Sequence, residues 1–202
     1  MKLICVGRNY SEHAKELGNA IPEEPILFIK PDSAVLKKGM DFYIPEFSNE
    51  IHYEVEVLIK ICKVGRGIQP EFAHTYYNEI GLGIDFTARD LQDKLKKEGK
   101  PWEKAKGFDG AAVIGEFFPK ENFDINNLQF SLFKNNEIVQ KGNTNQMLFS
   151  IDALICEISN YFMLKKGDII FTGTPKGVGK VEEGDILKGF IEEKENFSVR
   201  IK

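Results

Sequence analysis

The chain has 202 residues, 42% of them hydrophobic and 29% charged, and its formal net charge at pH 7 is −4. The length suits one domain, the charge leaves no basic footprint for nucleic acid, and no apolar run approaches the roughly 20 residues of a membrane helix. Three widely spaced cysteines argue against a disulfide framework or a zinc site. We therefore expect a cytoplasmic protein without nucleic-acid or membrane partners.

The N-terminal residues predict a short strand followed by a short helix. Residues 3 to 6 are apolar and predict the strand. Asn9 resembles a helix N-cap, because Glu12 follows three residues later in a capping-box pattern. On the predicted helix, His13 and Glu16 are neighbours at positions i and i+3. A carboxylate in that position can orient an imidazole and raise its basicity.

The strand predicted at residues 51–62 raises a question about its polar face. Apolar and polar residues alternate in IHYEVEV, so Glu54 and Glu56 point to the same side. Two adjacent like charges repel each other and resist burial. Either this face is in water, as one face of an antiparallel sheet often is, or it binds a hard divalent cation through its carboxylates. The alternation alone leaves both interpretations open.

The remainder of the chain predicts mostly strands. Further strands are expected at 26–30, 42–44, 81–88 and 169–175, helices at 70–79, 89–98 and from Ser150, a hairpin turn at Asn135-Asn136, and a closing hairpin in the last 19 residues. Strands and helices do not alternate regularly, which disfavours a doubly wound sheet. We therefore expect a mainly β fold with short helices, of the α+β type, arranged as a roll or sandwich.

The segment GTPKGVGK at residues 173–180 looks at first like a phosphate-binding loop. Five residues instead of four separate Gly173 from Gly179-Lys180, and Val181 stands where a serine or threonine would be needed to bind Mg²⁺. We therefore interpret this segment as a glycine-rich turn.

Asp85 gives the carboxylate pair a third candidate member. It is the only charged residue in the apolar run IGLGIDFTA, and an aspartate inside a buried strand is rarely left unpaired. One explanation is a strand-end cap or an ion pair with Arg89. The other is that its strand lies beside residues 51–62, so that Glu54, Glu56 and Asp85 converge on a divalent cation and leave positions free for substrate.

Six segments of the chain, taken in order, resemble the fumarylacetoacetate hydrolase family. They are VGRNYSEHAKEL, ILFIKP, HYEVEV, GIDFTARDLQ, PWEKAKGFDG and DIIFTGTPKGVG, and they cover nearly the whole chain. The resemblance is strongest to short, single-domain members, the acylpyruvase and oxaloacetate decarboxylase subgroup. Larger members carry a fourth metal carboxylate where this chain has Cys5 and Val6. The resemblance implies a mixed β-sandwich roll that forms a homodimer.

The resemblance also implies functions for nine residues. The Mg²⁺ or Mn²⁺ ligands of the family correspond to Glu54, Glu56 and Asp85. The residues implied to act in catalysis, a water-activating pair and a lysine, correspond to His13, Glu16 and Lys106. The positions that line the substrate site correspond to Arg89, Gln92 and Thr174. Composition alone does not separate Lys106 from its neighbour Lys104, and the family motif selects Lys106.

The implied activity is that of a divalent-metal-dependent hydrolase or lyase acting on small 2-oxo and 2,4-dioxo acids. It would hydrolyse the C–C bond of acylpyruvates, decarboxylate oxaloacetate, or do both, through a pyruvate enolate. An alternative is an isomerase or decarboxylase of aromatic-degradation intermediates such as 2-hydroxyhepta-2,4-diene-1,7-dioate. A non-catalytic binding protein is disfavoured because the implied catalytic residues are all present.

The domain organisation follows from the same reasoning. We expect one catalytic domain over residues 1–202, with an N-terminal strand and lid-helix segment at 1–45 and a β-roll core at 46–202. Within the first segment, residues 9–20 are expected to close over the metal and exclude water.

Overall fold

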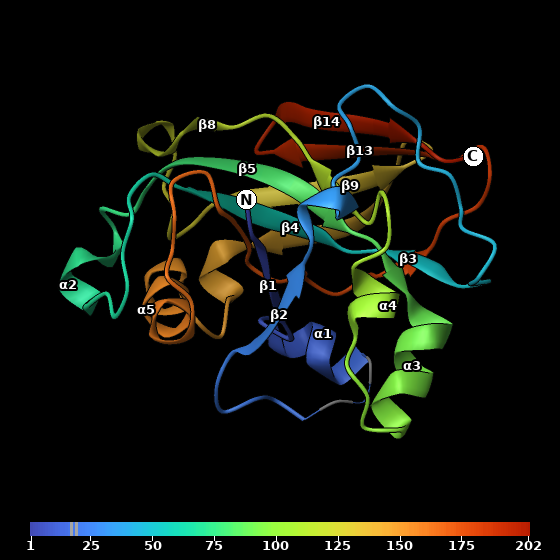
Figure 1. Ribbon diagram of the computed structural model, residues 1–202. Coiled ribbons are helices and arrows are strands. Elements are labelled where there is room, and N and C mark those ends of the chain that lie inside the picture. Colours follow the sequence, from blue (N-terminus) through green and yellow to red (C-terminus); the bar gives the residue numbers. More distant parts are fainter. Residues whose placement is uncertain (17, 19) are drawn as a thin grey trace.

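The computed structural model describes residues 1–16, 18 and 20–202 (Figure 1). Its strands are β1 (Leu3–Gly7), β2 (Ile26–Lys30), β3 (Ile51–Tyr53), β4 (Val55–Ile61), β5 (Tyr77–Asp85), β6 (Thr87–Ala88), β7 (Ala112–Ile114), β8 (Phe118–Pro119), β9 (Gln129–Lys134), β10 (Glu137–Asn143), β11 (Ile169–Phe171), β12 (Gly179–Lys180), β13 (Ile186–Ile191) and β14 (Lys194–Arg200). Its α-helices are α1 (Ser11–Glu16), α2 (Pro70–Ala73), α3 (Arg89–Lys97), α4 (Glu103–Lys106) and α5 (Ile151–Tyr161). The expected mainly β fold with short helices is confirmed.

The largest sheet runs in the order β2-β1-β11-β4-β5-β7, with β8 paired to β5. Both of its faces are apolar, because Ile4 joins the main core while its neighbour Leu3 packs in a smaller core on the other face. A bridge between Val35 and Ala112 brings the segment after β2 against β7. The two edges of the curled sheet therefore approach each other.

Two smaller sheets extend this arrangement. A second sheet has four strands in the order β10-β9-β13-β14, and its strands β13 and β14 lie above β4 and β5 in Figure 1. A three-stranded sheet, β12-β3-β6, continues from β4 and β5 after one-residue breaks at Glu54 and Phe86. Asn135 and Asn136 have φ angles of 52° and 72°, as a type I′ hairpin turn requires, so the predicted turn between β9 and β10 is confirmed.

The helices cover the sheets on two sides. Ser150 caps α5 by accepting a hydrogen bond from the Ala153 N–H, and the predicted apolar stripe of α5 is buried in the main core. Each fully buried leucine or isoleucine of that stripe contributes about 1.5–3 kcal/mol. On the other side, α1, α3 and α4 gather below the large sheet (Figure 1). In the described part of the chain, no helix is both long enough and apolar enough to cross a membrane.

Several predicted elements were wrong in their extent. The helix expected at 70–79 ends at Ala73, and Tyr77 already belongs to β5. The strand expected at 42–44 is a single bridge from Phe42 to Ile201. The strand expected at 51–62 is interrupted at Glu54, which separates β3 from β4. In each case long-range pairing, which a local pattern does not contain, decided the outcome.

The predicted capping box at Asn9 was also wrong. Helix α1 begins at Ser11, and the buried Asn9 side chain bonds to distant backbone instead. Its amide nitrogen donates to the carbonyls of Phe149 and Thr172, at 3.0 and 2.8 Å, and its oxygen accepts the Phe149 N–H at 2.8 Å. Asn9 thus ties the end of β1 to two remote segments. Of the predicted lid at 9–20, residues 17 and 19 lie outside the described residues.

Candidate metal and active centre

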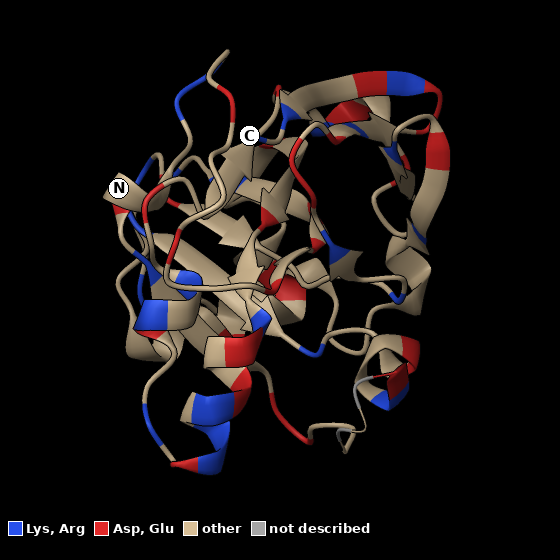
Figure 2. Ribbon diagram, turned by 90° about the vertical axis from the view of Figure 1, so that its right-hand side faces the viewer, with Lys and Arg blue, Asp and Glu red and all other residues tan. Residues whose placement is uncertain are grey.

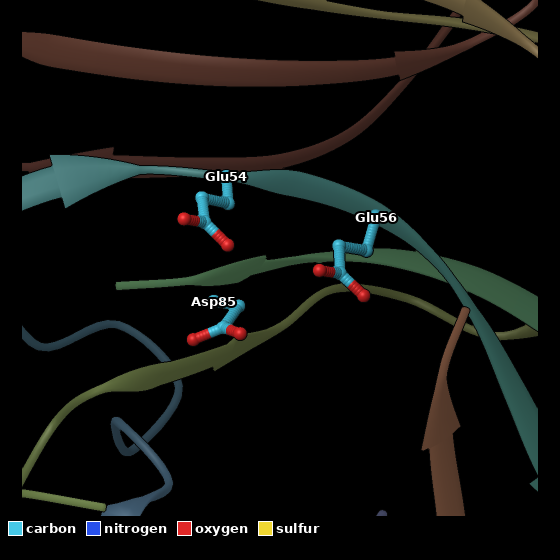
Figure 3. Close-up of side chains that lie close together, drawn as sticks. All are labelled: Glu54, Glu56 and Asp85. Carbon is cyan, nitrogen blue, oxygen red and sulfur yellow. The ribbon is translucent and has the colours of Figure 1, made fainter. Parts of the chain in front are cut away.

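Three buried carboxylates form the centre of the candidate site. Glu54 occupies the break between β3 and β4, Glu56 follows in β4, and Asp85 ends the neighbouring strand β5. One oxygen from each carboxylate lies within 4.8 Å of the other two. Figure 3 shows the three side chains directed into a common space. Their exposed fractions are 5%, 2% and 0%, so the interpretation of this strand face as solvated was wrong.

Three buried cations surround these carboxylates. The Lys106 amino group lies 2.9 Å from Glu54 Oε2 and 2.8 Å from Asp85 Oδ2. Arg89 pairs with the other oxygen of Glu54, so the ion pair between Arg89 and Asp85 considered from the sequence does not form. The Lys30 amino group lies 2.7 Å from Asp85 Oδ1. Glu54 and Asp85 therefore each have a positive charge close by, which buried ions require.

The two glutamates differ in their electrostatic surroundings. Burial raises the pKa of Glu54, but Lys106 and Arg89 outweigh it and hold the pKa well below its usual range. Burial and the neighbouring charges of Asp85 and Glu54 instead raise the pKa of Glu56 well above its usual value. Among the described residues, Glu56 accepts a hydrogen bond only from the Gly173 N–H, at 2.7 Å. A further positive charge beside the three carboxylates would therefore stabilise the ionised form of Glu56 more than that of Glu54.

Asp85 keeps one oxygen without a hydrogen-bond donor. The Lys30 amino group donates its hydrogen bonds to the backbone carbonyls of Phe86, Lys106 and Ala111. Asp85 Oδ1 therefore feels the charge of Lys30 but accepts no hydrogen bond, although it is buried. A buried carboxylate oxygen that accepts no hydrogen bond, beside two other carboxylates, is a donor set that suits a hard divalent cation. The residues present therefore fit the Mg²⁺ or Mn²⁺ that the family implies.

His13 and Glu16 lie together on α1, as predicted. His13 is buried, and its Nδ1 lies 3.2 Å from Glu16 Oε2. Burial lowers the pKa of His13, while Glu54 and Glu16 act in the opposite direction. The imidazole is therefore neutral at pH 7. With Nδ1–H donating to Glu16, Nε2 is the nitrogen that can accept a proton.

The glycine-rich segment after β11 donates hydrogen bonds to the carboxylate centre and to the His13–Glu16 pair. Its Gly173 N–H donates to Glu56, and its Gly177 N–H donates to Glu16 at 3.0 Å. Gly177 has a φ of +98°, and a Cβ there would lie 2.3 Å from the Val139 carbonyl oxygen, so only glycine fits. The segment thus contributes backbone donors to carboxylates of the site.

The three predicted substrate-site residues lie around the same centre. Arg89 donates to Gln92 at 2.6 Å, and both residues are buried at the start of α3. Thr174 accepts a hydrogen bond at 2.9 Å from Gln140, whose side-chain oxygen in turn accepts the Val55 N–H. Gln140 therefore connects the strand break at Glu54 with the glycine-rich segment.

One cavity is lined by eight of the nine predicted residues. All except Glu16 line it directly, together with Phe28, Trp102, Arg8 and Lys96 among others. Its volume is about 30 Å³, room for only two or three waters. A four-carbon acid is larger, so its entry requires neighbouring side chains or a lining segment to move.

Other candidates lie outside this cavity. His52 Nε2 lies 3.2 Å from Glu50, which also pairs with Lys180 at 3.1 Å, so these residues form a separate polar cluster. His74 is exposed. Lys104 is exposed while Lys106 is buried, so the structure separates the two lysines that composition could not separate.

Sequence reasoning missed four residues of the site, Lys30, Gln140, Arg8 and Lys96. A weak signal existed for two of them: Lys30 ends the apolar strand ILFIK, and Gln140 interrupts the strand EIVQK. Arg8 and Lys96 lie in polar surroundings that look solvated in the sequence.

The fold and the site together define a β-rich protein with a buried carboxylate centre beside a histidine–glutamate pair. The family model for the fumarylacetoacetate (FAA) hydrolase C-terminal domain matches residues 2–201. The chain belongs to this family.

Two relatives illustrate the similarity in sequence. The mitochondrial oxaloacetate decarboxylase of Dictyostelium discoideum is 46% identical over 189 residues, which cover 93% of this chain and 87% of the relative. The oxaloacetate tautomerase YcgM of Escherichia coli is 43% identical over 188 residues, covering 92% and 86%.

Two solved structures illustrate the similarity in fold. The fumarylpyruvate hydrolase of Pseudomonas aeruginosa, in complex with Mn²⁺ and pyruvate, matches with a TM-score of 0.93 and 35% identity, covering 100% of this chain and 89% of that one. The 5-carboxymethyl-2-hydroxymuconate delta-isomerase of Mycobacterium smegmatis matches with a TM-score of 0.86 and 30% identity, covering 99% and 78%.

Proposed function

We propose that this protein is a divalent-metal-dependent enzyme that breaks or rearranges the C3–C4 region of oxaloacetate and related 2,4-dioxo acids. The observation that carries this proposal is the convergence of Glu54, Glu56 and Asp85 in one cavity with His13 and Lys106. The relatives named for oxaloacetate chemistry support the substrate class.

Glu54, Glu56 and Asp85 would hold Mg²⁺ or Mn²⁺. When bound, the cation supplies a Lewis acid for the oxygens of a 2-oxo acid. The solved relative with Mn²⁺ and pyruvate supports a cation of this kind.

The protein's own residues would move protons and stabilise charge. For an acylpyruvate, Nε2 of His13 takes a proton from water, and the resulting hydroxide attacks the C4 carbonyl. The C3–C4 bond then breaks and leaves its electron pair on C3 as a pyruvate enolate. Lys106, an ammonium group held beside Glu54 and Asp85, stabilises the negative charge that develops on oxygen.

Oxaloacetate would need fewer steps at the same site. In decarboxylation CO₂ leaves C4 with the same electron pair remaining on C3, and no water attacks. In tautomerisation His13 moves a proton between C3 and the C2 oxygen, and no C–C bond breaks. The second candidate, isomerisation of a dienedioate from aromatic degradation, uses the same proton transfer, and the isomerase with a similar fold favours it.

A substrate panel tests the proposal. Oxaloacetate, acetylpyruvate, fumarylpyruvate and 2-hydroxyhepta-2,4-diene-1,7-dioate are assayed with Mg²⁺, with Mn²⁺ and with excess chelator. We expect metal-dependent turnover, highest with oxaloacetate. Turnover that is equal in chelator, or no turnover of any of the four acids, contradicts the proposal.

We also infer that the protein acts as a cytoplasmic homodimer. The family resemblance supports the dimer, and three free cysteines, of which Cys5 is fully buried, suit a reducing compartment. Light scattering on the purified protein tests the dimer, and a monomer mass contradicts it.

A further inference from the structure

Two basic side chains of the cavity have no place in the proposed chemistry. Arg8 follows the end of β1, and Lys96 belongs to the last turn of α3, whose basic and acidic segments are visible in Figure 2. Both line the cavity that contains the three carboxylates. Arg8 and Lys96 are far apart in the sequence, yet both side chains face the same cavity.

The charge of these two residues is not balanced within the site. Lys30, Lys106 and Arg89 already pair with the carboxylates of the centre. Within residues 1–16, 18 and 20–202, Arg8 forms no ion pair. Lys96 has Asp93 at 3.8 Å, and Asp93 is more than half exposed, so water screens the pair.

Arg8 and Lys96 also repel each other. Burial lowers the pKa of Lys96, and the charges of Arg89 and Arg8 lower it further, against the opposing effects of Asp93 and Glu54. An anion placed between the two side chains would relieve this repulsion. Lys96 lies 5.7 Å from the centre of the Trp102 ring, which limits its range of positions.

The backbone holds Arg8 in a fixed direction. Its φ angle is +59°, a left-handed conformation that residues other than glycine rarely adopt. The next residue, Asn9, fixes this turn through its three hydrogen bonds to Phe149 and Thr172. Strained conformations of this kind persist where the surrounding structure enforces them, and they cluster at ligand sites.

We propose that Arg8 and Lys96 bind the second carboxylate of a dicarboxylic oxo acid, whose 2-oxo acid end lies at the Glu54, Glu56 and Asp85 centre. This inference rests on the proposed function and narrows it to substrates with a distal carboxylate. A guanidinium can form two parallel hydrogen bonds to such a group, and the ammonium adds a point charge. A distal methyl group, as in acetylpyruvate, would leave both cations unpaired.

Turnover of a matched substrate pair tests the inference in the metal-loaded enzyme. For Arg8→Gln and Lys96→Met, we expect kcat/KM for tautomerisation of oxaloacetate, in which the C4 carboxylate keeps its charge, to fall about tenfold to a hundredfold more than for hydrolysis of acetylpyruvate, because a charge-assisted hydrogen bond is lost. Arg8→Lys should restore part of the difference. The controls Arg66→Gln and Lys97→Met remove exposed charges of the same kinds and should leave the ratio unchanged.

A binding measurement separates this inference from the proposed function. Malate and lactate share a 2-hydroxy acid end, and only malate has a second carboxylate. Calorimetric titration of the Mn²⁺-loaded protein should give tighter binding of malate, by about tenfold or more, and the double variant Arg8→Gln/Lys96→Met should lose this preference.

The outcomes are distinct. A wild-type protein that binds both acids equally, or neither, overturns the proposed carboxylate site, as does a preference that survives in the folded double variant. A malate preference that depends on Arg8 and Lys96, in a protein that turns over none of the oxo acids, supports the carboxylate site and contradicts the proposed function.

Discussion

The strand-borne half of the site and its helix-borne half are held in different ways. Glu54, Glu56 and Asp85 sit on paired strands, are buried, and have cations or an N–H within hydrogen-bond distance. His13 and Glu16 sit on the short helix α1, and Glu16 reaches the rest of the site through the Gly177 N–H, with its side chain 35% exposed.

The difference matches two proposed tasks, binding of the cation by the strand residues and proton transfer by the helix residue His13. The paired strands hold the three proposed cation ligands in fixed positions through backbone hydrogen bonds. The helix carries the proposed proton acceptor, His13, and Glu16 is attached to the rest of the site by one backbone donor, the Gly177 N–H.

The largest expected effect on turnover comes from removing one of the three strand-borne carboxylates. Glu54→Ala removes a proposed cation ligand and the one carboxylate with which both Arg89 and Lys106 pair. We expect turnover of every substrate to fall about a thousandfold or more in steady-state assays. Glu50→Ala, in the same register but outside the cavity, should stay within about twofold of wild type. Full activity of Glu54→Ala in excess chelator would exclude the metal interpretation.

Breaking the helix-borne half should have a selective effect. His13→Ala removes the proposed proton acceptor, so acylpyruvate hydrolysis should fall by about 10² to 10⁴. Decarboxylation of oxaloacetate should fall less, because no water is activated, and Mn²⁺ binding should not change. His74→Ala, at an exposed histidine, is the control. Equal losses in hydrolysis and decarboxylation would contradict the assignment of His13 to water activation.

Stability should also distinguish the strand-borne half of the site from the surface. Lys30→Met removes the cation that lies beside Asp85 Oδ1. It also removes a hydrogen-bond donor from three backbone carbonyls, those of Phe86, Lys106 and Ala111. The free energy of unfolding should fall by about 3–5 kcal/mol in urea denaturation. Lys104→Met, which removes an exposed lysine, should change it by less than about 0.5 kcal/mol. Equal values for the two variants would show that Lys30 is not needed to bury Asp85.

The smallest effect concerns a buried carboxylate outside the site. Burial raises the pKa of Asp168, but hydrogen bonds from Lys2 and from the Lys165 N–H outweigh it and hold the pKa below its usual range. Its contribution is therefore complete above the unfolded-state value of about 3.9 and is lost as the pH falls through the lower folded-state value.

Asp168→Asn should consequently destabilise the protein by about 2 kcal/mol at pH 7 and by less at pH 3. Urea denaturation at both pH values measures the difference, with the exposed Asp109→Asn as the control. A penalty that is the same at both pH values would mean that the charge of Asp168 is not what stabilises the fold. Asp168 thus provides a contrast with Glu56, whose surroundings disfavour its charge.

Local patterns in the sequence predicted the parts of the molecule that depend on local interactions. The turn at Asn135-Asn136 and the helix after Ser150 were correct because their determinants are adjacent in the chain. The helix expected at 70–79 was wrong because pairing with β4 extends β5 back to Tyr77.

The candidate site shows the same division. Alternation at Glu54 and Glu56 and the isolated charge of Asp85 were visible in the sequence, and the family motifs added the remaining positions. Lys30 and Gln140 gave only a weak signal as polar residues in apolar strands, and their place in the site was missed because those strands are far from Glu54 and Asp85 in the sequence. Their positions depend on the curled sheet, which no local period encodes.

The most direct test of the central claim is a count of bound Mn²⁺ by electron paramagnetic resonance. The wild-type chain should bind one Mn²⁺ per chain, and Asp85→Asn, checked for folding by circular dichroism, should bind none at the same concentrations. Equal Mn²⁺ binding by a folded Asp85→Asn variant, or no binding by the wild type, would contradict the assignment of Glu54, Glu56 and Asp85 as the metal centre.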